Sequence, residues 1–402
     1  MAAAEELDIV IVGGGICGLA TALGLHRKGI QSVVLERSDT LRATGAAITV
    51  FPNGWRALHQ LGLDSTLLST AIPWQRAVDI SPEGVAHEIR LSEEDTRCLR
   101  RGDLVEALAN ALPLQTIRFG CQVVSVNVEK SSSCAVLQLH DGSLIKAKVL
   151  IGCDGLNSVI ANYIGLKPTR FLSTCSVRGL TLYPNGHGYA PKSLRVRKDK
   201  HYVGRIPIDE KTVYWFVALE WIQKVDAKMP KDPASIRQLA LDRTAGFSKD
   251  IVEMIENSDL SSLSLTRLRY RAPWNLLSRS LRRETITVAG DAWHAMGPFL
   301  GQGGSVALED AVVLARCLSK KICNANMNRS RMHLSTQMAK DALDEYLKER
   351  RRRVVLLSTL TYLTGLLTIE DLSLLLRLLC IIIFAVVFRD RLNHTRYDCG
   401  EL

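Results

Sequence analysis

Three glycines close to the N-terminus have a spacing that suits phosphate binding. They are Gly13, Gly15 and Gly18, in the order Gly-x-Gly-x-x-Gly. In this arrangement the first glycine makes a tight turn, the second lets a pyrophosphate approach the backbone, and the third lets a helix pack on a strand. Glu36 follows 23 residues after Gly13, where a carboxylate accepts hydrogen bonds from ribose hydroxyls. These residues predict a dinucleotide site.

The segments around the glycines predict the elements that position them. Leu7–Val12 is a continuous apolar run, typical of a strand buried on both faces of a parallel sheet. Residues 19–28 have helical periodicity, and residues 32–35 predict a second buried strand. We therefore expect a βαβ unit whose helix N-terminus offers N–H groups and partial positive charge to phosphates.

A second pattern of this kind lies further along the chain. Residues 285–289 predict a buried strand that ends at Gly290 and Asp291, and a helix is expected over residues 305–318. Between them the chain has Pro298, Gly301, Gly303 and Gly304. With these motifs the chain resembles the group A flavoprotein monooxygenases, the aromatic hydroxylase family. The resemblance implies that Asp291 holds the ribityl chain of FAD and that the helix N-terminus faces the flavin pyrimidine.

Shorter segments resemble the same family. Residues 151–158 resemble its DG motif, which serves both FAD and NAD(P)H, and Arg101 matches the arginine beside the flavin. Residues 42–54 resemble the flavin-side loop. The tail over residues 394–400 looks like that of plant-type monooxygenases related to salicylate and 3-hydroxybenzoate 6-hydroxylases and to zeaxanthin epoxidase. The expected cofactor contacts are Gly13, Gly15, Gly18, Glu36, Arg42, Ala47, Arg101, Val124, Asp154, Gly155, Asp291, Pro298, Gly301, Gly303 and Gly304.

The chain departs from the family pattern at three positions. Ala47 stands where the family usually has a glycine next to the flavin, and Ser305 replaces the usual asparagine. No arginine stands near Ile160, where the DG motif usually closes with one. The first change bears on flavin mobility and the last on the binding of NAD(P)H, whereas neither argues against FAD.

The resemblance implies an FAD-dependent monooxygenase. In such enzymes NADPH or NADH reduces FAD, O₂ adds to form a flavin C4a-hydroperoxide, and one oxygen atom reaches an aromatic or similarly electron-rich small molecule. The chain has one glycine fingerprint, so the nicotinamide is expected to bind transiently in the substrate cleft. No side chain is assigned a catalytic role and no metal set is predicted, because the flavin carries the chemistry. The alternatives are a flavin-dependent reductase or epoxidase acting on an isoprenoid, and a flavin-binding protein without turnover.

The predicted fold class is α/β, with a Rossmann-type FAD-binding domain interleaved with a β-sheet substrate domain and followed by a helical C-terminal segment. Strand-like segments dominate residues 174–270 and interrupt the α/β framework. The expected boundaries are residues 1–72, 98–172 and 272–350 for the FAD-binding domain, 73–97 and 173–271 for the substrate domain, and 351–402 for the C-terminal segment.

Several side chains of the expected substrate sheet are candidates for substrate binding. Any one of Arg178, Arg195, Arg197 and Arg205 could pair with a substrate carboxylate. Tyr214 and Trp215 are neighbours, so strand alternation places one of them in a pocket and the other in the core. His294 could touch the cofactor or satisfy backbone groups in its loop.

The formal charge of +10 suits an anionic ligand. Much of it lies in short runs such as residues 267–271 and 348–353, which we interpret as solvated faces or as a channel for anionic cofactors or substrates. No run interleaves basic with aromatic residues, so nucleic acid is not an expected partner. The expected partners are a small molecule and O₂, bound by a monomer or a homodimer.

The ten cysteines include no CxxC pair and lie in a chain too long for a small disulfide scaffold. We therefore expect reduced thiols and a cytoplasmic location. Residues 372–388 are strongly apolar but contain Arg377, and residues 354–369 form another apolar stretch. Packed helices are the first interpretation of this tract, and a helix on a membrane surface or an anchor are the others.

Overall fold

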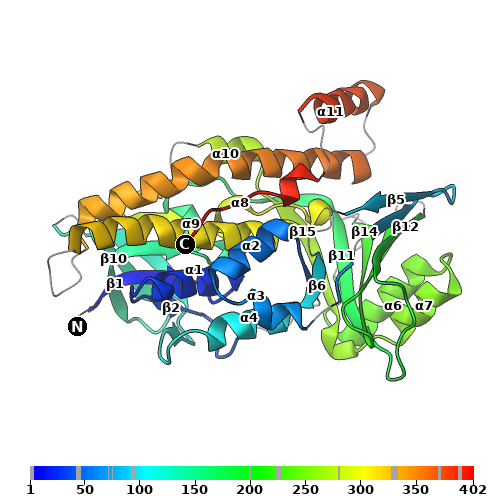
Figure 1. The fold of residues 1–402 in the computed structure, drawn as a ribbon, viewed down its shortest axis with the longest axis horizontal. Helices are drawn as coiled ribbons and strands as arrows, with labels where there is room; N and C mark the ends of the chain where they lie inside the picture. Colours follow the sequence, from blue (N-terminus) through cyan, green and yellow to red (C-terminus); the bar gives the residue numbers. More distant parts are fainter. Residues whose placement is uncertain are drawn as a thin grey trace.

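Two β-sheets organise the structure, a computed structural model that describes residues 4–41, 47–70, 72–74, 76–91, 96–129, 131–198, 201–221, 229–278, 281–326, 334–369, 373–387 and 392–402. The larger, eight-stranded sheet carries the N-terminus and lies on the left in Figure 1. Its strand order is β16 (Arg282–Arg283), β17 (Ile286–Val288), β10 (Leu144–Gly152), β1 (Glu5–Val12), β2 (Val33–Leu35) and β7 (Ile117–Arg118). Strand β9 (Ala135–Leu139) pairs with β10, and β8 (Val123–Val128) pairs with β9.

The centre of this sheet is parallel. Strand β1 pairs with β2 on one side and β10 on the other, and β10 pairs with β17. Helix α1 (Ile16–Arg27) connects β1 to β2, so the predicted βαβ unit is confirmed. The carboxyl ends of β1, β2, β10 and β17 meet at one edge, the place where open parallel sheets bind ligands.

The second sheet has seven strands. Its order is β15 (Ser264–Tyr270), β11 (Arg170–Leu182), β14 (Thr212–Glu220), β13 (His201–Pro207), β12 (Lys192–Lys198), β4 (Arg76–Ile80) and β5 (Ala86–Arg90). All neighbours are antiparallel except β12 and β4. Strands from residues 76–90 thus join strands from residues 170–270, and the interleaved fold class is confirmed.

Helices α6 (Pro233–Thr244) and α7 (Lys249–Glu256) cover one face of the seven-stranded sheet. A separate apolar core lies beneath them, and it contains Val177, Trp215 and Met254. The opposite face of this sheet turns toward the edge of the eight-stranded sheet where the parallel strands end.

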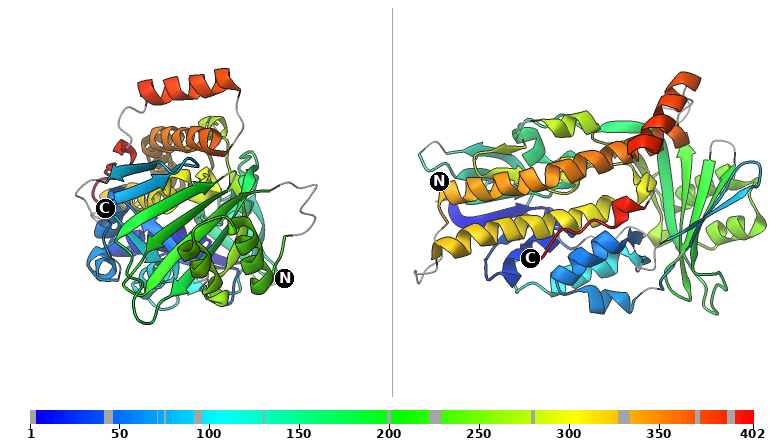
Figure 2. Two further views of the ribbon diagram at one scale, coloured as in Figure 1. Left: turned by 90° about the vertical axis from the view of Figure 1, so that its right-hand side faces the viewer. Right: turned by 45° about the horizontal axis from the view of Figure 1, so that its top comes forward.

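Most of the other helices belong to the layer of the larger sheet. Near the N-terminus they are α2 (Pro52–Gln60), α3 (Asp64–Leu68), α4 (Arg101–Asn110) and α5 (Val159–Tyr163), with the small antiparallel pair β3 (Ala47–Val50) and β6 (Arg97–Arg100). Later in the chain come α8 (Asp291–His294), α9 (Gly303–Asn326), α10 (Thr336–Ile369) and α11 (Leu374–Val387). The long helices α9 and α10 lie side by side in both views of Figure 2. Helix α10 continues without a break past residue 350, where the C-terminal segment is expected to begin.

The C-terminal helices differ in how they pack. Leu357 and Leu360 of α10 are buried, which confirms the expectation of a packed helix there. One face of α11 packs on the body, since Cys380 is buried and Phe384 contacts the main apolar core. Its other face is open, because Leu374, Leu375 and Val386 are each more than 60% exposed, so the expectation of a packed helix is met by only one side of α11. Figure 1 shows this helix at the top of the molecule. Within the described residues, no helix combines the length and apolar character that crossing a membrane requires.

Candidate active site

One large cavity separates the two sheets. Its volume is about 1880 Å³, and residues of both sheets, of α9, of α11 and of the C-terminal tail line it. Pockets for single small molecules measure about 300–1,000 Å³. The cavity therefore has room for a dinucleotide together with a second molecule.

Gly13 and Gly15 form part of one wall of the cavity. Gly13 has a positive φ of 109°, and a Cβ there would overlap the carbonyl of Cys153. A Cβ on Gly15 would meet open space, so this residue leaves the backbone accessible from the cavity. Gly18 does not line the cavity, but a Cβ there would overlap the Gly13 carbonyl, so it lets α1 pack against the loop.

Glu36 follows β2 and lines the same wall. Its carboxylate is buried, with Oε2 accepting the Gly14 N–H at 2.8 Å and Oε1 accepting the Ser38 N–H at 2.9 Å. Its place at the end of β2 beside the glycine loop is the one from which a carboxylate accepts hydrogen bonds from ribose hydroxyls.

Asp154 and Gly155 stand at the end of β10 and line the cavity. Asp154 Oδ2 accepts the Val159 N–H at 2.7 Å, while Oδ1 is buried and has no hydrogen-bond partner among the described residues. Burial raises the pKa of this carboxyl, although the Ser158 hydroxyl and nearby N–H groups act in the opposite direction. An orphaned acceptor on a cavity wall fits a ligand that donates a hydrogen bond there.

Ile160 explains the missing arginine of the DG motif. It is fully buried, and its side chain packs against Gly152 at the end of β10. The neighbouring Asn157 and Val159 line the cavity instead, and Arg269 donates to Asn157 Oδ1 at 2.7 Å. Position 160 is therefore a core position here and not a contact for a ligand.

Asp291 begins α8 at the end of β17 and opens onto the cavity. Desolvation by the surrounding protein raises the pKa of its carboxyl, while the charges of His294 and Arg101 act in the opposite direction. Arg101 begins α4 and lines the cavity as well. The structure thus brings together two predicted contacts that lie 190 residues apart in the sequence.

The loop before α9 and the first turn of that helix carry four more of the predicted contacts. Pro298, Gly301, Gly303 and Gly304 all line the cavity, and a Cβ on Gly303 would meet open space. The first turn of a helix has N–H groups without intrahelical partners, so α9 presents donors there.

The other predicted contacts have different outcomes. Ala47, at the start of β3, lines the cavity. Val124 does not, since its side chain is 42% exposed, whereas its neighbours Gln122 and Val123 do. Arg42 lies outside the described residues.

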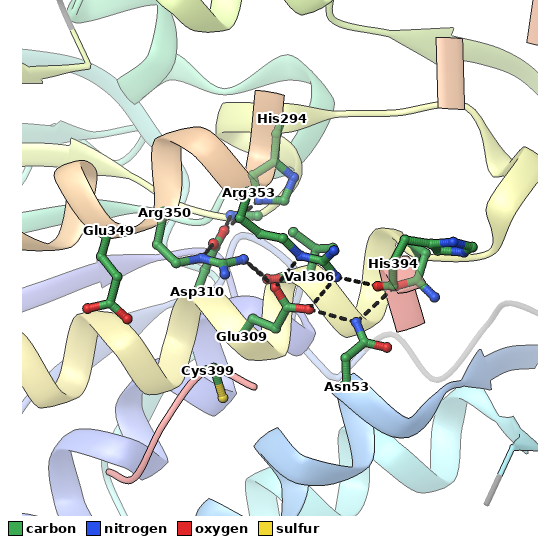
Figure 3. A network of polar contacts seen from close by, with 12 residues as sticks. Asn53, His294, Val306, Glu309, Asp310, Glu349, Arg350, Arg353, His394 and Cys399 are labelled. Atoms are coloured by element: carbon green, nitrogen blue, oxygen red, sulfur yellow. Dashed lines mark hydrogen bonds and ion pairs between the residues drawn. The ribbon is translucent and has the colours of Figure 1, made fainter. Parts of the chain in front are cut away.

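Behind the loop that precedes α9 lies a group of four charged side chains that we call the buried ion cluster. Its members are Glu309 and Asp310 of α9 and Arg350 and Arg353 of α10. Figure 3 shows Arg350 between the two carboxylates, with distances of 2.7 Å to Glu309 and 2.8 Å to Asp310. Arg353 also pairs with Glu309 at 3.0 Å. Glu309, Asp310 and Arg350 are fully buried, so the cluster joins α9 to α10 inside the protein.

The cluster also holds the loops that carry the predicted contacts. Asp310 Oδ2 accepts the Gly290 N–H at 3.0 Å and lies 2.5 Å from His294 Nε2. Asn53 donates to Glu309 at 2.6 Å, and Arg353 donates to the His394 carbonyl at 2.7 Å (Figure 3). Burial alone raises the pKa of Asp310, but the charges of His294 and Arg350 outweigh it and lower the pKa to about 2.

Two interpretations of single residues need correction. His294 neither lines the cavity nor satisfies only backbone groups, because it is fully buried against Asp310. The basic runs are not simply solvated faces, since Arg350 and Arg271 are buried. Sequence reasoning missed the cluster, although Arg350 shares a helical stripe with Leu343 and Tyr346, and that spacing indicates burial.

The seven-stranded sheet closes the cavity with three aromatic side chains that we call the aromatic wall: Tyr202, Tyr214 and Phe216. The Phe216 ring lies about 6 Å from each tyrosine ring, and it crosses Gly204, where a Cβ would overlap it. Trp215 points the other way into the core, as alternation requires. Burial raises the pKa of Tyr214 to about 12, so its hydroxyl stays protonated at neutral pH.

These features fit FAD. The cavity offers two helix N-termini, exposed glycine backbone, the carboxylates of Glu36 and Asp291, and an Asp154 oxygen without a partner among the described residues. All of them lie near the carboxyl edge of a parallel sheet.

Comparison with known proteins agrees with this geometry. A family described as "FAD binding domain" matches residues 6–357. "Monooxygenase 1" of Arabidopsis thaliana is 46% identical over 99% of this chain and 100% of its own length, and "Monooxygenase 2" of the same plant is 36% identical over 98% of both. HpxO of Klebsiella pneumoniae, solved with FAD and uric acid, has the same fold, with a TM-score of 0.79 at 21% sequence identity. The match covers 97% of this chain and 96% of the HpxO chain.

Proposed function

The chain belongs to the FAD-binding-domain family of monooxygenases, and we propose that it uses NADPH or NADH and O₂ to hydroxylate an aromatic or similarly electron-rich small molecule. The observation that carries the proposal is the single cavity in which the dinucleotide-binding edge faces the aromatic wall. Aromatic rings pack well against aromatic rings in edge or offset geometries, so this wall suits a planar substrate.

Each part of the cavity has a defined task in this proposal. The N-terminus of α1 and Gly15 bind the pyrophosphate, Glu36 binds a ribose, and Asp291 binds the ribityl chain. The N-terminus of α9 stabilises negative charge on the flavin pyrimidine. Bound FAD supplies the redox chemistry, taking electrons from the reduced nicotinamide and enabling transfer of one oxygen atom from O₂ to the substrate.

The aromatic wall and α11 enclose the substrate end of the cavity. Ile381 and Phe384 of α11 line it together with the aromatic wall. Apolar side chains at this end exclude water, which protects a reactive oxygen-transfer step from side reactions.

The visible spectrum of the purified protein tests the proposal. We expect an FAD absorption band that bleaches when NADPH or NADH is added without oxygen. In a set of phenolic compounds, the one that is the substrate should make this bleaching faster. On return to air, that compound gains one oxygen atom, detected by mass spectrometry. A flavin band that neither nicotinamide bleaches, with any compound, contradicts the proposed electron donor.

Replacement of Asp291 tests the FAD site itself. Asp291→Ala removes the carboxylate at the end of β17, so we expect the protein to lose FAD on gel filtration. Asp242→Ala, on the exposed surface of α6, is the matched control and should retain it. Full FAD retention by Asp291→Ala would mean that this residue does not hold the cofactor.

A further inference from the structure

The C-terminal tail over residues 392–402 lines the cavity but has no task in the proposed function. Leu392, His394 and Thr395 belong to the cavity wall, and Thr395 is buried. Figure 1 shows the tail in red, running beside α9 and α2 to the end of the chain. Its regular structure is a short 3₁₀ turn at Asn393–Thr395, so its position depends on contacts with other elements.

Three arginines, one each from α2, α9 and α10, hold this tail by its main chain. Each donates hydrogen bonds to carbonyl oxygens of the tail: Arg56 to Arg396, Arg316 to Cys399 and Glu401, and Arg353 to His394. The bonds from Arg316 and Arg353 measure 2.6 to 2.8 Å. Hydrogen bonds from a charged donor are among the stronger ones in proteins. The tail is therefore held along its length on the layer that these helices form.

Arg353 also connects the tail to the loop before α9. Its guanidinium pairs with Glu309 at 3.0 Å while it donates to the His394 carbonyl (Figure 3). Glu309 accepts a hydrogen bond from the Asn53 amide at 2.6 Å, and the same amide donates to Gln302 at 2.9 Å. Glu309, Asn53 and Gln302 are buried, and breaking such a bond leaves polar groups without water. A continuous polar network thus runs from the tail to Gln302.

The network ends at the part of the cavity wall that carries predicted cofactor contacts. Gln302 stands between Gly301 and Gly303, which both line the cavity. In the proposed FAD site this loop leads into the helix N-terminus that faces the flavin. The position of the tail and the position of this loop are therefore coupled.

Resting on the proposed function for the FAD site, we infer that residues 392–402 form a strap that closes the cavity beside the flavin. Arg353 is its positioning residue, since it does not line the cavity but holds both the tail and Glu309. The strap places Leu392 and Thr395 in the cavity wall, which keeps water from the flavin, and it fixes the loop at Gln302 through the buried network.

Two measurements on the FAD-bound protein test this inference. Quenching of flavin fluorescence by iodide reports how open the cavity is, and the fluorescence rise after dilution reports the rate of FAD release. In Arg353→Met we expect the quenching constant to rise several-fold. FAD release should become about 10-fold faster, as expected for the loss of one hydrogen bond to a charged donor. Arg353→Lys keeps the charge but lacks the planar fork, so its values should lie between those of wild type and Arg353→Met.

A second variant separates the tail from the Glu309 network. Arg316 holds the tail through the carbonyls of Cys399 and Glu401, whereas Arg353 holds both the tail and Glu309. Arg316→Met should therefore raise iodide quenching as Arg353→Met does, with a smaller effect on FAD release.

Arg237→Met is the matched control. Arg237 of α6 also donates to a main-chain carbonyl, that of Glu256 at 3.0 Å, but both residues are exposed and lie outside the cavity wall. This variant should keep the wild-type values of both measurements, and a rise in quenching equal to that of Arg353→Met would overturn the inference.

The outcomes distinguish a strap from a purely structural role. Unchanged quenching in Arg353→Met overturns the inference even if Tm falls, because the tail then contributes to stability alone. A rise in Arg353→Met without one in Arg316→Met also overturns it, since the effect then comes through Glu309. If Arg353→Met does not fold, unchanged quenching in both Arg353→Lys and Arg316→Met overturns it. Wild-type protein that binds no FAD contradicts the proposed function instead.

Discussion

Removal of Arg350 tests the importance of the buried ion cluster most directly. Arg350→Met replaces the guanidinium with an apolar side chain and leaves Glu309 and Asp310 buried with one partner fewer each. Breaking a buried ion pair by removing one partner costs about 3–5 kcal/mol. The low pKa of Asp310, about 2 against an ordinary 3.8, corresponds to about 2 kcal/mol, and Arg350 shares that effect with His294. Glu309 adds to the cost, because burial acts to raise its pKa and the charges of Arg350 and Arg353 outweigh that effect and lower it.

The loss translates into a measurable fall in melting temperature. An unfolding entropy of about 2.1 cal/mol/K per residue over 402 residues gives roughly 0.8 kcal/mol/K, so 3–5 kcal/mol lowers Tm by about 4–6 °C for a single transition. Differential scanning calorimetry on the FAD-bound protein measures this value. Lys320→Met is the matched control, since Lys320 also joins α9 to α10 by an ion pair, with Glu345, but in an exposed position. Its loss should stay below about 1 kcal/mol.

The pH dependence gives a second test. The folded-state pKa of Asp310 lies below its unfolded value, so its contribution to stability is present above about pH 4 and is lost as the pH falls toward 2. Arg350→Met raises that pKa, so the Tm gap between wild type and variant should narrow below pH 4. Equal Tm losses in Arg350→Met and Lys320→Met, or a gap that stays constant down to pH 3, would refute this account of the cluster.

Two further predictions concern the cavity. Gly204→Ala should raise KM for the substrate several-fold with a smaller change in kcat, because the added Cβ displaces the Phe216 ring of the aromatic wall. An unchanged KM would mean that the ring does not contact the substrate. Iodoacetamide at pH 8, followed by peptide mass mapping, should label the half-exposed Cys121 and Cys134 before Cys17. The hydrogen bond from the Cys153 thiol and burial raise the pKa of Cys17 well above its ordinary range, so early labelling of Cys17 would contradict this prediction.

Local sequence predicted the elements of the dinucleotide edge well. The buried strand at Leu7–Val12 and the tight turn at Gly13 could be predicted without the rest of the chain. A continuous apolar run and a glycine turn depend only on residues that are neighbours in the sequence. Ser305–Leu318 was predicted as a helix, and α9 is longer at both ends, because packing on α1 and α10 extends it.

The state of the charged residues could not be predicted in the same way. Four arginines of one sheet look alike in the sequence, yet Arg195 and Arg205 pair with carboxylates from β4 and α7. Arg178 has no such partner in the part of the chain that the structure describes. Likewise, position 160 resembles a family contact in spacing but lies in the core. Such outcomes depend on partners that are distant in the chain.

The sequence by itself determined the βαβ unit, the order of the motifs and hence the expectation of FAD, because glycine spacing and apolar runs act over a few residues of backbone. Only the tertiary structure decided which arginine of the seven-stranded sheet has no carboxylate partner among the described residues, that Arg350 is buried between two carboxylates, and that one face of α11 is exposed. Burial and ion pairing are properties of surfaces brought together by folding, so no single segment carries them.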